Sequence, residues 1–292
     1  MNRSLLIVIV IIPIFLTLAY FGFRAETNVD TQVDIDDQQV QFKSRERILI
    51  AVSIAPLADF VENVGGNRVD IIVMVPPSAD PHTYELTPRQ MTEVAKADMY
   101  VEVGSGLEFE EIWMNRIMEN NKGMPIVDSS TGTWQIDRDP HIWTSPKNAK
   151  VMVENIYSAL IAIDTENLTY YEANKDNYLE QLDELDLEVR ESLEGVTNRN
   201  FLVYHPNWEY FSRDYGLNQM AVEDEGKEPS PERLASLIEQ AKDNDIKVIF
   251  ATSHRESSAN VIAREIGGVV VLVDPFSQDY IETIAWIGAF LV

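Results

Sequence analysis

The sequence predicts an α/β protein in which two lobes, each built on a parallel sheet, are joined by one long helix. Short apolar runs alternate with amphipathic segments over residues 47–127 and again from residue 200 onward, which is typical of parallel α/β lobes. Between them a helical pattern extends from Tyr170 to Leu193 and would reach about 35–40 Å. A helix of that length can cross from one lobe to the other, so we expect a cleft between the lobes.

The first lobe is predicted from apolar runs and helix-ending signals. Gly65-Gly66 is a natural helix stop, and Thr87, Pro88 and Gln90 form the pattern of a capping box. Strands are expected at Ile48–Ser53, Val69–Val75, Met99–Val103 and Pro125–Val127, and helices at Ala55–Val64, Pro88–Lys96, Glu110–Asn120 and Pro146–Ile163.

The second lobe follows the long helix, for which Asn167-Leu168-Thr169 is the expected cap. In this lobe Ser230 is the expected N-cap of a helix that opens at Pro231. Strands are expected at Asn200–Tyr204, Lys247–Ala251 and Val269–Val273, and helices at Trp208–Tyr215, Pro231–Asp243, Ser257–Ile266 and Ile281–Leu291.

The amino-terminal residues differ from the rest of the chain. An uncharged apolar run from Ser4 to Phe23 predicts a signal peptide or a membrane anchor over residues 1–24, and an uncleaved anchor is favoured. Residues 25–46 form an acidic tether without a periodic apolar face. We therefore expect the boundaries 1–24, 25–46, 47–165 for the first lobe, 166–196 for the linking helix and 197–292 for the second lobe, with the body outside the cytoplasmic membrane.

Composition excludes several classes of function. The formal net charge is −25 over 292 residues, whereas nucleic-acid binding requires a basic surface. The chain contains no Cys, which removes disulfides, thiolate metal sites and Cys nucleophiles. Any transition-metal site must therefore use His and carboxylate ligands.

Three of the four His residues stand beside Pro at predicted element boundaries. His82 follows a Pro-rich loop after a strand, His141 follows Asp139-Pro140, and His205 ends a strand and precedes Pro206. Ligands of open α/β sheets bind at the carboxyl ends of the strands. Convergent neutral imidazoles most often hold a metal, so the three are candidate ligands of one site.

A fourth candidate ligand is Asp274, which follows the strand ending at Val273. A helix-cap role explains this residue about equally well. Three imidazoles and one carboxylate suit Zn²⁺, whereas Ca²⁺ and Mg²⁺ prefer more oxygen ligands. His254 also follows a strand but lacks an adjacent Pro, and is expected at the rim of the site. Glu209 is expected at the surface, with support of His205 as the alternative.

Five motifs in order resemble one known family over about residues 47–292: DPHTYELTP, DPHIW, YHPNWEYF with YGL, EGKEPSPERL and VLVDPFSQDYI. The chain resembles the zinc- and manganese-binding proteins of ABC-type metal importers, the cluster A-I family of TroA and ZnuA. That resemblance implies a metal held between two α/β lobes joined by a rigid helix, with ligands at His82, His141, His205 and Asp274. It also implies an ABC permease with its cytoplasmic ATPase as partner. The chain departs from the family in lacking a His-rich acidic loop and a lipobox Cys.

The sequence therefore favours a monomeric, non-enzymatic protein that captures Zn²⁺ for import. A manganese-specific importer component and an adhesin of the same fold are the alternatives. A zinc hydrolase is a further hypothesis, although HExxH and similar motifs are missing from the sequence.

Overall fold

The computed structural model describes residues 47–77, 79–223 and 227–291. The expected signal peptide or anchor and the acidic tether lie outside these residues. In the described part of the chain, no helix combines the length and apolarity that crossing a membrane requires.

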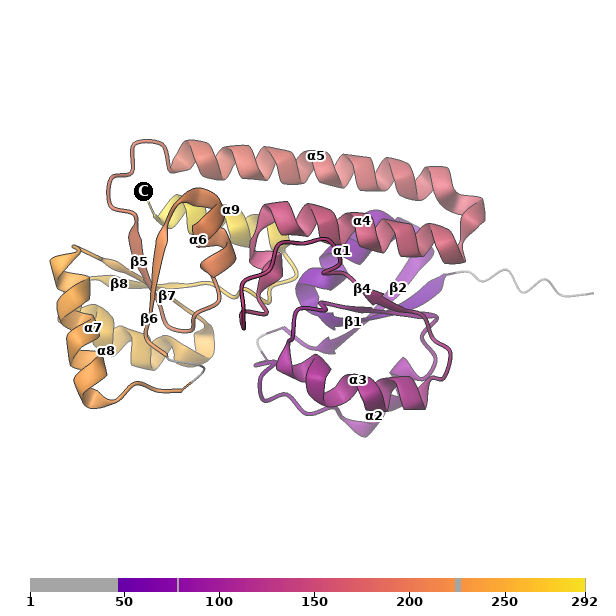
Figure 1. Ribbon diagram of the computed structural model, residues 1–292, viewed down its shortest axis with the longest axis horizontal. Helices are drawn as coiled ribbons and strands as arrows, with labels where there is room; N and C mark the ends of the chain where they lie inside the picture. The colour runs from indigo at the N-terminus through magenta and orange to yellow at the C-terminus, as the bar shows by residue number, and fades with distance from the viewer. Residues whose placement is uncertain (1–46, 78, 224–226, 292) are drawn as a thin grey trace, which may run out of the picture. The chain divides into compact units, whose positions relative to one another are not determined.

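Two four-stranded parallel sheets form the centres of the two lobes (Figure 1). The strand order is β2-β1-β3-β4 in the first sheet and β6-β5-β7-β8 in the second, so the two lobes repeat one topology. The strands are β1 (Ile48–Ile54), β2 (Val69–Val75), β3 (Met99–Glu102), β4 (Ile126–Asp128), β5 (Asn200–Val203), β6 (Asn218–Ala221), β7 (Val248–Ala251) and β8 (Val269–Leu272).

Helices cover both faces of each sheet, which explains why the central strands are nearly continuous apolar runs. In the first lobe α1 and α4 lie on one side of the sheet and α2 and α3 on the other (Figure 1). The helices are α1 (Ala55–Gly65), α2 (Pro88–Val94), α3 (Glu108–Asn120), α4 (Pro146–Ile163), α5 (Leu168–Ser192), α6 (Glu209–Tyr215), α7 (Pro231–Asp243), α8 (Glu256–Ile266) and α9 (Tyr280–Phe290).

The long helix α5 joins the two lobes, as predicted. It packs against α1 and α4 of the first lobe and against α9 of the second. Its buried side chains recur at helical spacing, which gives one apolar stripe. They are Tyr171, Tyr178, Leu182, Leu185 and Val189. Leu187 lies off this stripe and is 56% exposed.

Two helix starts match their sequence signals and one does not. Thr87 and Gln90 form the expected capping box, and the Ser230 hydroxyl accepts a hydrogen bond from the Arg233 amide. Asn167 makes no cap bond to α5; its side-chain amide donates to Asp164 instead. Asn167 therefore stands at the predicted N-cap position, but its side chain closes the preceding turn and does not cap the helix.

The sequence analysis also missed strand β6. This strand lies at the edge of the second sheet and, among the described residues, pairs with β5 alone. Its sequence NQMA carries little of the alternation that identifies a strand, since an edge position leaves part of each side chain in water. The strand is nevertheless important for the site, because the chain leaving it carries Glu223.

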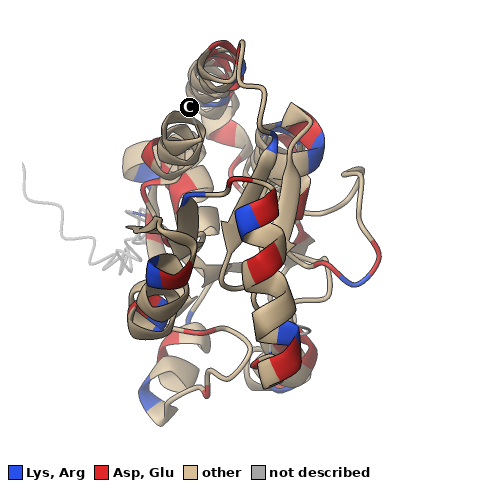
Figure 2. Cartoon of the chain, turned by 90° about the vertical axis from the view of Figure 1, so that its left-hand side faces the viewer, with Lys and Arg blue, Asp and Glu red and all other residues tan. Residues whose placement is uncertain are grey.

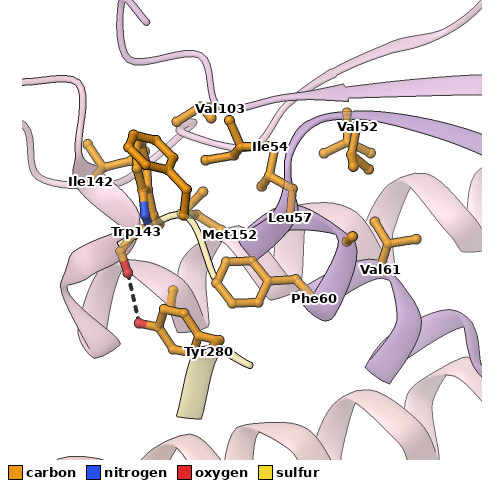
Figure 3. Packing of buried hydrophobic residues seen from close by; sticks show 14 of the residues in the cluster. Val52, Ile54, Leu57, Phe60, Val61, Val103, Ile142, Trp143, Met152 and Tyr280 are labelled. Atoms are coloured by element: carbon orange, nitrogen blue, oxygen red, sulfur yellow. Dashed lines mark hydrogen bonds between the residues drawn. The ribbon is translucent and has the colours of Figure 1, made fainter. Parts of the chain in front are cut away.

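The core joins residues that are distant in sequence (Figure 3). The buried ring of Trp143 donates its indole N–H to the carbonyl of Pro275, 2.8 Å away. The buried Tyr280 hydroxyl donates to the carbonyl of Trp143 at 2.8 Å, and the Tyr280 ring packs edge-on against Phe60. These contacts tie the segment that follows His141 to the C-terminal part of the chain.

Charge lies on the outer helices and loops, while the strands between them are mostly uncharged (Figure 2). With 48 Asp and Glu against 23 Lys and Arg in the whole chain, the surface is expected to attract cations.

Candidate metal centre

His82, His141 and His205 meet at one point, as the sequence predicted. One ring nitrogen of each lies within 4.8 Å of the corresponding nitrogens of the others. His82 stands on the loop between β2 and α2, His141 precedes a 3-10 turn at Ile142–Thr144, and His205 follows β5 by two residues. The group therefore draws on both lobes at the carboxyl ends of their sheets.

Two of the His residues are oriented by the same local device. In the sequences Asp80-Pro81-His82 and Asp139-Pro140-His141, the Asp carboxylate accepts the backbone N–H of the His two positions later, at 3.0 and 2.9 Å. The intervening Pro fixes its own φ and lacks a competing N–H donor. The repeated Asp-Pro-His motif is thus a rigid turn that presents an imidazole.

Each imidazole is also held by a carboxylate at Nδ1. The distances are 2.8 Å from His82 to Glu108, 2.7 Å from His141 to Asp139 and 2.7 Å from His205 to Glu223. An ionised carboxylate can only accept, so Nδ1 carries the proton and Nε2 keeps its lone pair. This arrangement is the one that proteins use to fix the tautomer and orientation of metal-binding His.

The Nε2 atoms of His82 and His141 are buried and have no hydrogen-bond partner among the described residues. Buried polar nitrogens are almost always satisfied, so two unsatisfied acceptors that face each other require an explanation. A cation at the centre of the three rings would satisfy both. The donor set of convergent imidazoles fits a first-row divalent metal.

The environment shifts the pKa values of the two His in opposite directions. Burial lowers the pKa of His141, and the adjacent Asp139 only partly offsets this effect. Burial also acts to lower the pKa of His82, but the hydrogen bond and charge of Glu108 outweigh it, and the pKa of His82 is raised. The hydrogen bond from His82 in turn lowers the pKa of Glu108.

Asp274 lies near the three His but is not part of their group of converging atoms. It lines the same cavity of about 160 Å³ as His82 and His205. Its carboxylate accepts the backbone N–H of Phe276 at 2.9 Å, which closes a turn well before α9 begins. The structure thus brings together three of the four predicted ligands and places the fourth at the cavity wall.

His254 and Glu209 lie outside the cluster of His82, His141 and His205. His254 is exposed and lines the cavity, with its Nε2 3.3 Å from the Thr252 hydroxyl. Glu209 is exposed and accepts from Gln219, whereas Glu223 is the carboxylate that contacts His205. Sequence reasoning missed Glu108 and Glu223, because 26 and 18 positions separate them from their His.

Comparison with known proteins places this geometry in a family. Residues 50–289 match the family model described as "ZnuA: Zinc-uptake complex component A periplasmic". A putative metal-binding protein of Chlamydia muridarum is 31% identical over 235 residues, covering 79% of this chain and 85% of the relative. The high-affinity zinc uptake system protein ZnuA of Bacillus subtilis is 26% identical over 246 residues, covering 76% of each chain. The manganese ABC transporter substrate-binding lipoprotein PsaA of Streptococcus anginosus is 27% identical, covering 72% of this chain and 74% of the relative.

The fold gives the same result. A crystal structure of ZnuA superposes with a TM-score of 0.81 at 37% identity, covering 84% of this chain and 98% of that chain. A ZnuA deletion mutant with bound zinc superposes with a TM-score of 0.80, also at 37% identity, covering 84% of this chain and 96% of that chain. Two parallel α/β lobes, a linking helix and three convergent His therefore make this chain a member of the ZnuA family of metal-binding proteins of ABC importers.

Proposed function

We propose that the protein captures Zn²⁺ outside the cytoplasmic membrane and delivers it to an ABC-type importer. The observation that carries the proposal is the convergence of three imidazoles whose Nδ1 atoms are each bound by a carboxylate. This leaves three Nε2 lone pairs directed at one point. The metal is the cargo of the protein, so the site must bind tightly and also release.

Zinc is favoured over the other common cations by the chemistry of the donors. Neutral imidazole is intermediate between hard and soft ligands, which suits Zn²⁺. Zn²⁺ also binds a given site more tightly than Mn²⁺ in the general affinity order of divalent metals. The names of the Bacillus relative and of the zinc-bound crystal structure are consistent with this metal. Since a manganese-transport lipoprotein is also among the relatives, Mn²⁺ is the competing metal in the test below.

Asp274 is the proposed fourth ligand. Its carboxylate holds the turn through one oxygen, Oδ1, and the second oxygen is not needed for that bond. The residue already lines the cavity that contains His82 and His205, so Oδ2 is available as a ligand at the same cavity. Three nitrogens and one oxygen would then complete a tetrahedral zinc site.

The proposed partners follow from the family and from the amino-terminal sequence. The metal is handed to a membrane permease driven by a cytoplasmic ATPase, and residues 1–24 hold the protein at the membrane or direct its export. The strongly acidic composition favours a local excess of cations around the protein.

A competition titration tests the proposal. The full-length chain is purified without a polyhistidine tag, stripped with chelator and titrated with Zn²⁺ and with Mn²⁺ against a chromogenic chelator. We expect one Zn²⁺ per chain and a rise in melting temperature with excess Zn²⁺. Absence of zinc binding, or equal affinity for both metals, would overturn zinc capture, and a zinc-dependent hydrolytic activity would favour the hydrolase hypothesis.

A further inference from the structure

Arg255 is connected to the proposed metal ligand His205 through one carboxylate. Its guanidinium Nη2 forms an ion pair with Oε1 of Glu223 at 2.6 Å, and Oε2 of the same carboxylate lies 2.7 Å from Nδ1 of His205. The Glu223 side chain is 2% exposed, so water cannot replace either partner. Glu223 thus faces the arginine with Oε1 and the imidazole with Oε2; the contact at Oε1 is an ion pair without the alignment of a hydrogen bond, whereas Oε2 is hydrogen-bonded to His205.

Arg255 has further contacts that orient it. Its Nη1 donates to Glu228 at 3.1 Å, and the Tyr204 hydroxyl donates to both oxygens of Glu228. The guanidinium also lies 5.5 Å from the centre of the Tyr204 ring. Because Glu228 is 57% exposed, its contact orients the guanidinium without locking it, and the oriented guanidinium favours one position of the Glu223 carboxylate.

The other two carboxylates of the site are supported differently. Within the residues that the structure describes, the ion pairs of Glu108 and Asp139 are with His82 and His141 alone. Asp139 stands two positions before its His, and a turn orients it. Glu108 is half-exposed and can exchange its contact with water. Glu223 is buried, lies 18 positions from His205 and has no such turn, so its orientation depends on a third residue.

We propose that Arg255 is a positioning residue of the metal site, which acts on His205 through Glu223. This rests on the proposed function, since the quantity that Arg255 controls is the direction and the tautomer of a metal-binding imidazole. When the arginine is lost, the buried carboxylate has no counter-charge on Oε1 and rotates away from Nδ1. The imidazole then no longer presents Nε2 to the metal in a fixed direction.

Affinity measurements on four single variants of the full-length chain, purified without a polyhistidine tag, test the proposal. Arg255→Gln should lower zinc affinity by about 10-fold, and Glu223→Gln by about 10–100-fold, the range found for outer partners of metal-binding His. Arg255→Lys keeps the charge but not the forked contact, and should restore only part of the loss. Arg264→Gln makes the same change at an exposed position of α8 and should bind zinc as the wild type does.

The direction in which Arg255→Gln changes zinc affinity distinguishes a positioning role of Arg255 from electrostatic repulsion between its charge and the metal. Removal of a nearby cation would by itself strengthen the binding of another cation. A variant that binds zinc as tightly as the wild type, or more tightly, would overturn the proposal. In the double variant Arg255→Gln/Glu223→Gln the two losses of zinc affinity should not add. Both changes disturb the same contact, the one between Glu223 and His205. Additive losses would also overturn the proposal, since Arg255 would then act by another route.

A spectroscopic signature separates positioning from a purely structural role. The chain has four His, so selective ¹⁵N labelling gives four pairs of ring resonances. In the metal-free wild type we expect His205 to be protonated at Nδ1, and in Arg255→Gln to show both tautomers while His82 and His141 keep their shifts. Unchanged His205 resonances would contradict the inference even if the variant melts earlier. Failure of the wild type to bind zinc at all would instead contradict the proposed function.

Discussion

Asp139 contacts His141 at two points through a single oxygen. Its Oδ1 accepts the His141 backbone N–H at 2.9 Å and lies 2.7 Å from Nδ1 of the same ring. One carboxylate oxygen thus sets both the backbone turn and the orientation of the imidazole. The Asp139 side chain is 13% exposed, which leaves little room for water to take over this role.

The first prediction compares Asp139 with Glu108. Asp139→Asn should lower zinc affinity on the order of 10–100-fold, because a neutral amide supports the imidazole less well than a carboxylate. Glu108→Gln should cost less, since Glu108 is 47% exposed and water can replace its contact with His82. Chelator competition on both variants gives the ratio of their zinc affinities. A larger loss of zinc affinity for Glu108→Gln than for Asp139→Asn would show that burial of the carboxylate does not determine how much it contributes.

The second prediction concerns pH. Zinc requires neutral imidazoles, so protons compete with the metal for the ring nitrogens. Because the pKa of His82 is raised, this competition begins above 6.5 as the pH falls, whereas the lowered pKa of His141 keeps that ring neutral to lower pH. Zinc affinity measured from pH 8.5 to 5.5 should therefore fall steadily below neutrality. A pH-independent affinity would indicate a carboxylate site instead.

The third prediction concerns metal preference. We expect the wild type to favour Zn²⁺ over Mn²⁺ by at least about 100-fold, roughly 3 kcal/mol. His205→Glu should narrow that gap, because it replaces a nitrogen donor by an oxygen donor, and His205→Ala should weaken both metals. The measurement is the same titration with both metals. Zinc affinity untouched by His205→Ala would remove His205 from the ligand set.

The fourth prediction concerns the buried carboxyl of Glu110, which receives the backbone N–H groups of Val103 and Gly104. Burial raises its pKa from 4.5 to about 7. Between those values the folded chain retains a proton that the unfolded chain has released, so stability falls as the pH rises, by roughly 3 kcal/mol.

Glu110→Gln should remove this part of the pH dependence, and urea unfolding at pH 5 and pH 8 measures it. The informative quantity is the difference in stability between the two pH values, because glutamine offers one oxygen to two N–H donors and changes the absolute stability as well. An equal difference for wild type and variant would contradict the prediction. Burial also raises the pKa of Asp59, to about 6. Asp59 therefore contributes to the pH dependence of stability equally in the wild type and in Glu110→Gln.

The fifth prediction concerns the hydrogen bond from Tyr280 to the carbonyl of Trp143, which Figure 3 shows. Tyr280→Phe keeps the ring but removes the buried hydroxyl, and should cost about 1–2 kcal/mol of unfolding free energy. Tyr170→Phe is the matched control, because its hydroxyl bonds Asn67 at the surface. Equal losses in thermal or urea unfolding would show that burial of the Tyr280 contact adds nothing.

Much of the fold was predictable because its signals are local. The apolar run of β2 was predicted with its observed ends, and Thr87-Pro88 with Gln90 marks the start of α2. Strand β6 was missed because its stability comes from pairing with β5 and not from its own sequence. Asn167 stands at the predicted N-cap position, but sequence alone does not show that its side chain bonds Asp164 and not the first turn of α5.

The convergence of the three His was predictable for a related reason: a His next to Pro at an element boundary is a local pattern. The carboxylates that hold them differ in this respect. Asp139 stands in the same motif as His141, but Glu108 and Glu223 reach their imidazoles only after the chain has folded. The role of Asp274 could not be predicted from the sequence. An Asp at the end of a strand can close a short turn or bind a metal, and the sequence looks the same in both cases.

The contacts of Trp143 also bear on the order in which the protein acquires its structure. They join residues 132 and 137 positions apart, so Phe60 and Trp143 cannot complete their packing until the last part of the chain has been synthesised. Contacts of such long sequence separation slow folding. The core around Phe60 and Trp143 therefore cannot be completed before α9 has been made, so the last helix of the chain finishes the packing of its first lobe.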